Sequence, residues 1–269
     1  MITCDFHGRL GNNLFQMATV ISLAKQINED FIFPHEALAG HRGKITVDLG
    51  LFKYKFQRGH YIADNEHHES KFEYEKIEAK KSLKIAGFFQ SHCYFDNVRE
   101  DLLEIYFTPS EEIKNKLTQY LISDYSLGIS VRRGDYLMLQ GNHCVLSSEY
   151  YQNTIDKHFS EGIDQIYIFS DDLDWCRDIF GDQVIYVNDS IGVQLFLMSK
   201  MKNLILSNST FAWWGAYLNQ TAEKIIIPDP WFGPNNHDKD TIGLYYPNWI
   251  IEKHTIQNQN YTLTQNMFN

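Results

Sequence analysis

The chain has 269 residues, 43% hydrophobic and 14% aromatic, enough for one large domain or two of ordinary size. Its formal net charge of −10 argues against nucleic acid or an anionic membrane as the main partner. No apolar stretch approaches the roughly 20 residues of a membrane span, and we expect no signal peptide. The four cysteines are scattered without metal-ligand spacing, so we expect reduced thiols in a cytoplasmic protein.

The first half of the chain predicts a weakly patterned Rossmann-like unit that begins with a strand, a glycine-containing turn and a helix. The predicted elements are a strand over 1–5, a helix over 14–28, strands over 31–33 and 82–86, and a helix over 111–123. Gly8 and Gly11 permit a tight turn and close approach of the backbone to a ligand. The turn is not a GxGxxG fingerprint, which disfavours a dinucleotide cofactor. Residues 35–80 show little periodicity.

The second half alternates strands and helices more regularly. The predicted strands are 127–131, 165–169, 183–187, 203–206 and 224–227, and the predicted helices are 147–159, 173–180, 191–201 and 211–219. Pro228 is expected to end the last strand. Repeated βα units of this length predict a parallel sheet covered by helices. The fold class is therefore α/β, with two Rossmann-like halves that face a cleft.

We place the domain boundary in a linker at residues 122–126. Residues 1–124 form one predicted domain and residues 125–269 the other, with the last segment expected to pack back on the first domain. In such sheets, ligands bind beyond the carboxyl ends of the strands.

Two adjacent arginines follow the predicted strand 127–131. Because side chains alternate along a strand, Ser130 and Arg132 should share one face, with Arg133 and Asp135 on the other. One arginine can then reach a ligand while the other pairs with a carboxylate. A guanidinium binds phosphate oxygens through two parallel hydrogen bonds, so a nucleotide diphosphate is the expected partner, and a surface salt-bridge pair is the alternative.

A second anion site is predicted at residues 207–210, which read SNST between an apolar strand and an aromatic-rich helix. Small hydroxyl residues there can cap the helix, and free backbone N–H groups at a helix N-terminus bind anions without a metal. An ordinary helix cap without a ligand is the alternative. Phe211, Trp213 and Trp214 are interpreted as packing residues.

The motifs resemble those of the α-1,2-fucosyltransferases of glycosyltransferase family 11. Residues 8–16 read GRLGNNLFQ, close to the family's GGLGNQMFQ, and residues 131–136 read VRRGDY, close to its HxRRxD signature. Residues 207–216 read SNSTFAWWGA, close to SNSSFSWWGA. Weaker similarities are GFFQS at 87–91, FSDD at 169–172 and PDPW at 228–231.

This resemblance implies a GT-B fold whose N-terminal half binds the acceptor and whose C-terminal half binds GDP-fucose. It implies metal-independent, inverting transfer of L-fucose to a galactose O2, with an oligosaccharide or glycolipid acceptor and peripheral membrane association through a lipid-linked one. Arg132 would hold the diphosphate. The complete predicted donor site is Gly8, Gly11, Asn12, Ser130, Arg132, Arg133, Asp135, Ser170, Asp171, Gln194, Asn208, Ser209 and Thr210.

Two departures from the family pattern concern the nucleotide base. Ser130 stands where the signature has histidine, and Gln194 where the family usually has aspartate. An aspartate accepts two hydrogen bonds from guanine, whereas a glutamine amide offers one acceptor and a donor. The alternatives are therefore a transferase for another nucleotide sugar and a non-catalytic glycan-binding protein. Asn13 replaces the family's glutamine beside the turn.

The group that accepts the acceptor's proton is not evident from the motifs. His7, beside the turn, and His143, after the arginines, are the candidate bases, and a structural histidine is the alternative for each. Asp171, Asp172 and Asp174 could instead hold a metal. We favour helix capping for Asp172 and Asp174, and we predict no metal site.

Overall fold

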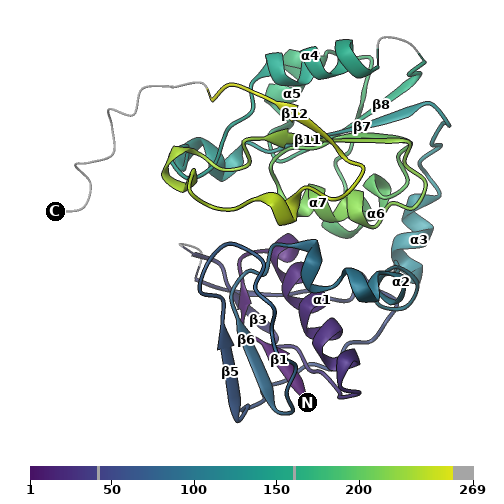
Figure 1. The fold of residues 1–269 in the computed structure, drawn as a ribbon. Coiled ribbons are helices and arrows are strands. Elements are labelled where there is room, and N and C mark those ends of the chain that lie inside the picture. The colour runs from purple at the N-terminus through teal and green to yellow at the C-terminus, as the bar shows by residue number, and fades with distance from the viewer. Residues whose placement is uncertain (41–42, 160–161, 257–269) are drawn as a thin grey trace.

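The protein folds into two α/β halves joined at residues 118–125, one above the other in Figure 1. The structure is a computed structural model that describes residues 1–40, 43–159 and 162–256. Residues 257–269, part of the segment expected to pack back on the first half, lie outside the described residues. The predicted linker at 122–126 follows the last helix of the first half, and its last residue, Ser126, begins the first strand of the second half.

The described part of the N-terminal half contains two small sheets. A parallel sheet has the order β1 (Ile2–Cys4), β6 (Leu83–Ala86) and β5 (Asn65–His68). The second pairs β2 (Phe6–His7) with β3 (Glu36–Leu38) in parallel, and β3 with β4 (Lys44–Thr46) antiparallel. The predicted strand 31–33 forms only isolated bridges, to Ile2 and Arg58. These short strands follow the weak periodicity of the region.

Helix α1 (Leu10–Gln26) follows the glycine turn and is buried along nearly its whole length. The half continues with α2 (Arg99–Asp101), a π-helical turn (Leu102–Tyr106) and α3 (Glu111–Leu117). The prediction of a helix to residue 123 is wrong, because α3 ends at Leu117. The Thr118 hydroxyl donates to the Asn115 carbonyl at 2.7 Å and so competes for a backbone acceptor near the helix end.

The C-terminal half has a six-stranded sheet in the described chain, ordered β12-β11-β10-β7-β8-β9, with every neighbouring pair of strands parallel. Its strands are β7 (Ser126–Val131), β8 (Gln165–Ser170), β9 (Ile185–Tyr186), β10 (Asn203–Ile205), β11 (Lys224–Asp229) and β12 (Ile250–Lys253). The connecting helices are α4 (Ser148–His158), α5 (Leu173–Phe180), α6 (Ile191–Met198) and α7 (Thr210–Tyr217). The predicted parallel α/β sheet is confirmed.

The expectation that Pro228 ends β11 is wrong. The strand continues to Asp229, and Pro228 pairs in register with Glu252 of β12, a strand that the sequence pattern did not predict. Pairing with β10 ends at Ile226, so Pro228 lies where β11 has a single neighbour. A proline is tolerated there because its missing N–H is not needed on the unpaired side.

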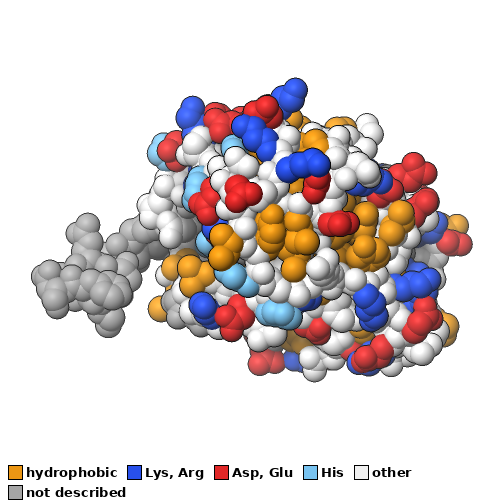
Figure 2. All heavy atoms as spheres, turned by 90° about the horizontal axis from the view of Figure 1, so that it is seen from below, with side chains coloured by type: hydrophobic (Ala, Val, Ile, Leu, Met, Phe, Trp, Pro, Cys, Tyr) orange, Lys and Arg blue, Asp and Glu red, His pale blue; other side chains and the backbone are white. Residues whose placement is uncertain are grey.

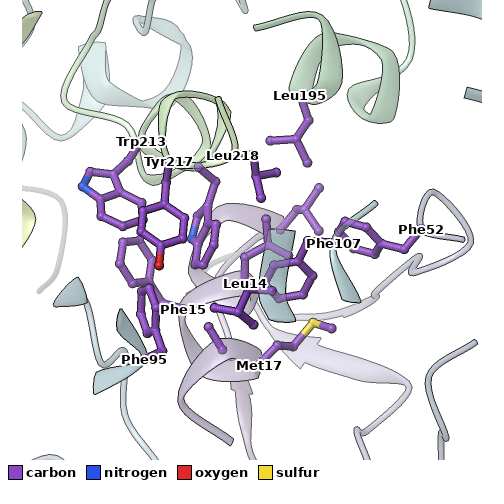
Figure 3. Packing of buried hydrophobic residues seen from close by; sticks show 14 of the residues in the cluster. Leu14, Phe15, Met17, Phe52, Phe95, Phe107, Leu195, Trp213, Tyr217 and Leu218 are labelled. Carbon is purple, nitrogen blue, oxygen red and sulfur yellow. The ribbon is translucent and has the colours of Figure 1, made fainter. Parts of the chain in front are cut away.

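The main hydrophobic core runs through both halves along the contact between α1 and α7. The Phe15 ring lies 4.6 Å from that of Trp213 and 5.2 Å from that of Trp214, centroid to centroid. Figure 3 shows Phe15 and Phe95 directly below Trp213 and Tyr217. Both tryptophans are fully buried, as their interpretation as packing residues requires. The apolar sequence of α7 therefore fixes one half on the other.

The chain between β11 and β12 runs along the edge of the C-terminal half that faces the N-terminal half, as the yellow-green segment in Figure 1 shows. The Tyr246 hydroxyl donates to Asp96 at 3.1 Å, and the rings of Phe72 and Phe232 meet edge to face at 5.0 Å. On the face drawn in Figure 2, acidic and basic side chains are interspersed around small groups of apolar side chains. No helix in the described part of the chain has the length and hydropathy needed to cross a bilayer.

Candidate active site

A cleft of about 1010 Å³ lies between the halves and is lined by both. It collects every predicted site residue except Arg133. From the C-terminal half come Ser130, Arg132, Asp135, His143, Ser170, Asp171, Gln194, Asn208, Ser209 and Thr210, and from the N-terminal half come His7, Gly8, Gly11 and Asn12. The residues from the C-terminal half form the upper wall of the cleft. They lie close together because β7, β8 and β10 are parallel neighbours whose carboxyl ends meet at one edge of the sheet.

Arg132 leaves the end of β7 toward the cleft. Its Nη1 lies 2.6 Å from Asp171 Oδ2, and its Nη2 contacts Asp135. The guanidinium also lies over the Tyr136 ring, 5.1 Å from the centroid. Two carboxylates and an aromatic face thus hold this cation in one orientation, with 19% of the side chain exposed. A guanidinium fixed in this way can receive a diphosphate with little loss of side-chain freedom.

Arg133 points away from the cleft, so its predicted place in the donor site is wrong. Its Nε lies 3.0 Å from Asp172 Oδ2, and its guanidinium stacks 4.1 Å from the centroid of Trp175. Its backbone N–H donates to Asp171 Oδ1 at 2.9 Å. Alternation along the strand correctly separates the two arginines, one toward the cleft and one into the protein.

Alternation fails for Asp135, which lies on the side of Arg132 and not of Arg133. The chain leaves the strand after Val131 and forms a 3-10 helix over Gly134–Met138, so the period of two no longer applies. Asp135 also contacts Arg9 of the N-terminal half. Burial by itself would raise the pKa of Asp135, but Arg132 and Arg9 hold that pKa below its ordinary value. This carboxylate therefore stays charged and joins the two walls.

The N-terminus of α7 forms the other anion-binding element of the upper wall. Ser209 is the N-cap residue, yet its hydroxyl makes no capping hydrogen bond. The expectation that small hydroxyl residues cap this helix is therefore wrong for Ser209. Thr210 instead donates its hydroxyl to Asn12 Oδ1 at 2.8 Å, across the boundary between the halves. Ser209 and Thr210 line the cleft at the start of α7, so an anion in the cleft can meet the N-terminal end of this helix.

Asn208 forms hydrogen bonds that join three other segments of the chain around the site. The Asn208 Nδ2 donates to the backbone carbonyls of Cys144 and Trp231, each at 2.9 Å. The backbone carbonyl of Asn208 accepts from Tyr136 Oη at 3.0 Å. The side chain is 1% exposed. Its amide nitrogen therefore joins two loops, whereas its side-chain oxygen Oδ1 has no hydrogen-bond partner among the described residues, and Asn208 lines the cleft.

The turn before α1 brings the lower wall into contact with α7. Gly8 has a φ of +79°, and a Cβ on Gly11 would lie 2.5 Å from the backbone nitrogen of Phe211. Asn12 Oδ1 accepts from Thr210 and, at 3.1 Å, from Gln90 Nε2. Gly11 therefore permits close approach of α1 to the N-terminus of α7, and the predicted approach of the backbone to a ligand stays a prediction.

The positions that depart from the family pattern have partners within the protein. Ser130 and Ser207 share a hydrogen bond of 2.9 Å between their hydroxyls. Gln194 donates its amide to the Asp189 carbonyl at 2.8 Å and lines the cleft. The Asp189 carboxylate accepts from Gln119 at 3.0 Å and does not line the cleft. Asp189 is therefore not a substitute for the aspartate that Gln194 replaces.

Ser170, at the end of β8, uses its Oγ to accept the backbone N–H of Asp172 at 2.9 Å. Asp172 caps α5 by accepting from the Trp175 N–H at 3.2 Å, and Asp174 lies in the first turn beside Arg177. Capping by Asp172 thus agrees with the prediction. In the described ranges, no group of three or more His, Cys, Asp or Glu residues has an arrangement that could hold a metal ion.

Both candidate bases line the cleft, one on each wall. The His7 ring lies 6.2 Å from that of Phe88, and the His143 ring stacks on Tyr136 at 4.2 Å with an angle of 8°. Burial lowers the pKa of His143, so its imidazole is neutral at neutral pH and can accept a proton.

Sequence reasoning missed Arg9 and Tyr136. Arg9 lies between Gly8 and Gly11. This motif was interpreted through its backbone conformation, and the charge of Arg9 was not considered. Tyr136 packs against Arg132 and His143, and burial raises its pKa to about 12. Its position directly after the Arg-Arg-Gly-Asp run was the available signal.

Solved structures identify the fold. A NodZ α-1,6-fucosyltransferase co-crystallised with GDP superposes with a TM-score of 0.56 at 13% identity, covering 85% of this chain and 94% of that one. POFUT1 in complex with GDP-fucose gives a TM-score of 0.51 at 12% identity, covering 84% and 96%. The fold of this chain is therefore GT-B-like.

The sequence matches the family model "Glycosyl transferase family 11" over residues 1–253, and the chain belongs to this family. An O-antigen biosynthesis glycosyltransferase, WbnK of Escherichia coli, is 33% identical over 62% of this chain and 61% of its own length. An alpha-1,2-colitosyltransferase of E. coli is 34% identical over 57% of each. Galactoside alpha-(1,2)-fucosyltransferase 1 of Bos taurus is 27% identical over 80% and 66%. The alignments thus span about three-fifths of these relatives' lengths.

Proposed function

We propose that this protein transfers L-fucose from GDP-β-L-fucose to O2 of a galactoside with inversion of configuration. The observation that carries the proposal is the position of Arg132, held in the cleft near the uncapped N-terminus of α7. Membership of family 11 and relatives named as galactoside α-(1,2)-fucosyltransferases support the choice of sugar and linkage.

The diphosphate of the donor would lie between Arg132 and the first turn of α7. As the bond between C1 of fucose and the phosphate oxygen breaks, negative charge grows on the departing GDP. A fixed guanidinium and backbone amides stabilise that charge more than they stabilise the bound donor, which lowers the barrier. Ser209 supplies a hydroxyl at the same place.

The acceptor hydroxyl attacks C1 from the face opposite the leaving diphosphate and loses its proton to a base. His7 and His143 are the two histidines that line the cleft in the described chain. The acceptor is a galactose residue of an oligosaccharide or of a glycolipid, and in the second case the protein would work beside a membrane.

A second donor sugar is favoured by a specific observation. A relative that is 34% identical is named as an alpha-1,2-colitosyltransferase. Both hypotheses keep the diphosphate site and differ in the sugar. A parallel assay of GDP-fucose and GDP-colitose with one galactoside separates them by their kcat/KM values.

The base-recognition departures give a direct prediction. If Gln194 faces guanine, its amide satisfies only part of the N1–H and amino edge, and an unpaired buried donor costs about 1–3 kcal/mol. Gln194→Asp is then expected to tighten GDP roughly 5- to 150-fold, and more than UDP or dTDP. Gln194→Asn is the matched control, because it shortens the side chain equally without adding charge. Calorimetric titration of the three nucleotides measures the difference, and equal GDP affinity in both variants would show that residue 194 does not contact the base.

We also expect full activity after treatment with EDTA and removal of the chelated metal. Arg132 and the α7 amides carry the counter-charge for the diphosphate, so no step of the proposed reaction needs a divalent ion. The measurement is the transfer rate before and after chelation. Loss of activity that Mn²⁺ restores would contradict the proposal and would favour a metal held by Asp171 and Asp172.

A further inference from the structure

Phe88 is an aromatic side chain presented to the cleft by the N-terminal half. It lines the cleft with 41% of its surface exposed, whereas the neighbouring Phe89 is fully buried against Tyr94. An exposed aromatic ring gives up the stabilisation that burial would bring, and this one lies in the lining of the cleft.

The backbone that presents Phe88 has an uncommon conformation. Gly87 has a φ of +155° and Phe89 a φ of +52°, and a bulky residue rarely adopts a positive φ. A Cβ on Gly87 would lie 2.4 Å from Glu69 Cβ, so glycine is needed for this approach. Strained backbone of this kind concentrates at ligand sites, where the surrounding structure over-determines it.

A carboxylate clamp holds the loop in this conformation. Glu69 accepts the N–H of Phe88 at 2.7 Å through Oε2 and that of Phe89 at 2.9 Å through Oε1. From the other side, the buried Gln16 donates to the Gly87 carbonyl at 2.8 Å. The clamp fixes the orientation of Phe88 without contacting its ring.

The Phe88 ring lies beside a candidate catalytic residue of the cleft. His7, a candidate base, has its ring 6.2 Å from that of Phe88. Two residues further along the loop, Gln90 donates to Asn12 Oδ1, the same oxygen that accepts from Thr210 of α7. The loop therefore connects the exposed ring to the N-terminus of α7, where the donor diphosphate is proposed to lie.

We propose that Phe88 is the platform on which the acceptor sugar stacks, and that Glu69 is the positioning residue that presents it. The ligand class is a pyranoside with one apolar face, such as galactose, whose C3, C4 and C5 hydrogens cover a flat aromatic surface. An aromatic ring offers such a sugar a large apolar area with few torsions to fix. The inference deepens the proposed function and rests on it for the identity of the acceptor.

The first test measures transfer from GDP-fucose to lactose. Phe88→Ala is expected to raise the KM for lactose about tenfold or more while GDP affinity stays as in the wild type. Phe88→Tyr keeps the ring and should restore the KM, whereas Phe88→Leu keeps only apolar volume and should not. Glu69→Gln leaves one amide N–H without an acceptor and should give an intermediate KM. Ile62→Ala, at an 81% exposed apolar residue outside the cleft lining, is the matched control.

The second test does not depend on turnover. Saturation-transfer NMR of methyl β-D-galactopyranoside should show the strongest transfer at H3, H4 and H5 with the wild type, and loss of it with Phe88→Ala. This separates the two proposals, because failure of GDP-fucose to serve as donor leaves the galactoside signal intact. An unchanged lactose KM in folded Phe88→Ala, or no galactoside signal from the wild type, would overturn the platform.

Discussion

Replacing Arg132 with alanine is expected to reduce kcat/KM by about 10²- to 10³-fold or more while the protein stays folded. The substitution removes the cation from the cleft and leaves Asp135 and Asp171 facing the donor without it. Breaking a buried charged pair costs roughly 3–5 kcal/mol, and here the partner charges would also repel the diphosphate. Steady-state kinetics and GDP titration are the measurements.

Arg133→Ala is the matched control, because the neighbouring arginine pairs with Asp172 and stacks on Trp175 outside the cleft. It should lower the melting temperature while the folded fraction still binds GDP. A folded Arg132→Ala enzyme with near-normal turnover would contradict the assignment of the diphosphate site.

Gly11→Ala is expected to have the second-largest effect, through the contact between α1 and α7. The added methyl group would lie 2.5 Å from the Phe211 nitrogen and 2.6 Å from Thr210 Oγ1, so the two helix ends must separate. Overpacking costs typically about 1–3 kcal/mol, and a displacement of about 1 Å at a reacting centre can cost about 10²-fold in rate. We therefore expect both the unfolding free energy and the transfer rate to fall.

Gly59→Ala provides the comparison for this variant. Its nearest contact would be the flexible end of Ile32, at 3.1 Å, and neither residue lines the cleft. Urea unfolding and transfer rates of the two variants are the measurements. If Gly11→Ala behaved like Gly59→Ala in both, the contact of α1 with α7 would not position the site.

The parallel sheet and the cleft residues could be predicted because both follow from local patterns. Apolar strands ending in polar residues place Arg132, Asp171 and Ser209 at one sheet edge, and parallel order brings those ends together. The same logic separates Arg132 from Arg133. The family resemblance supplied the remaining constraint, that the turn at Gly8 and Gly11 faces the same cleft.

The sequence predictions that are wrong concern residues whose positions are set by tertiary contacts and not by a local repeat in the sequence. Asp135 lies in a 3-10 turn, so strand alternation assigned it to the wrong side, and its contact with Arg9 joins residues 126 positions apart. β12 was missed because it is a strand of only four residues whose side chains are half-buried or exposed. Its pairing with β11, which the sequence pattern does not show, is what defines it. The clamp on Phe88 was invisible because Glu69 lies in a stretch without periodicity.

The most direct test of the account is the linkage that the protein makes. GDP-β-L-fucose and lactose are incubated with the purified chain, and the product is isolated and analysed by NMR. We expect a single new α-linked fucose on O2 of galactose, formed with release of GDP. A β-linked product, a different linkage position, or transfer only from a nucleotide other than GDP would contradict it.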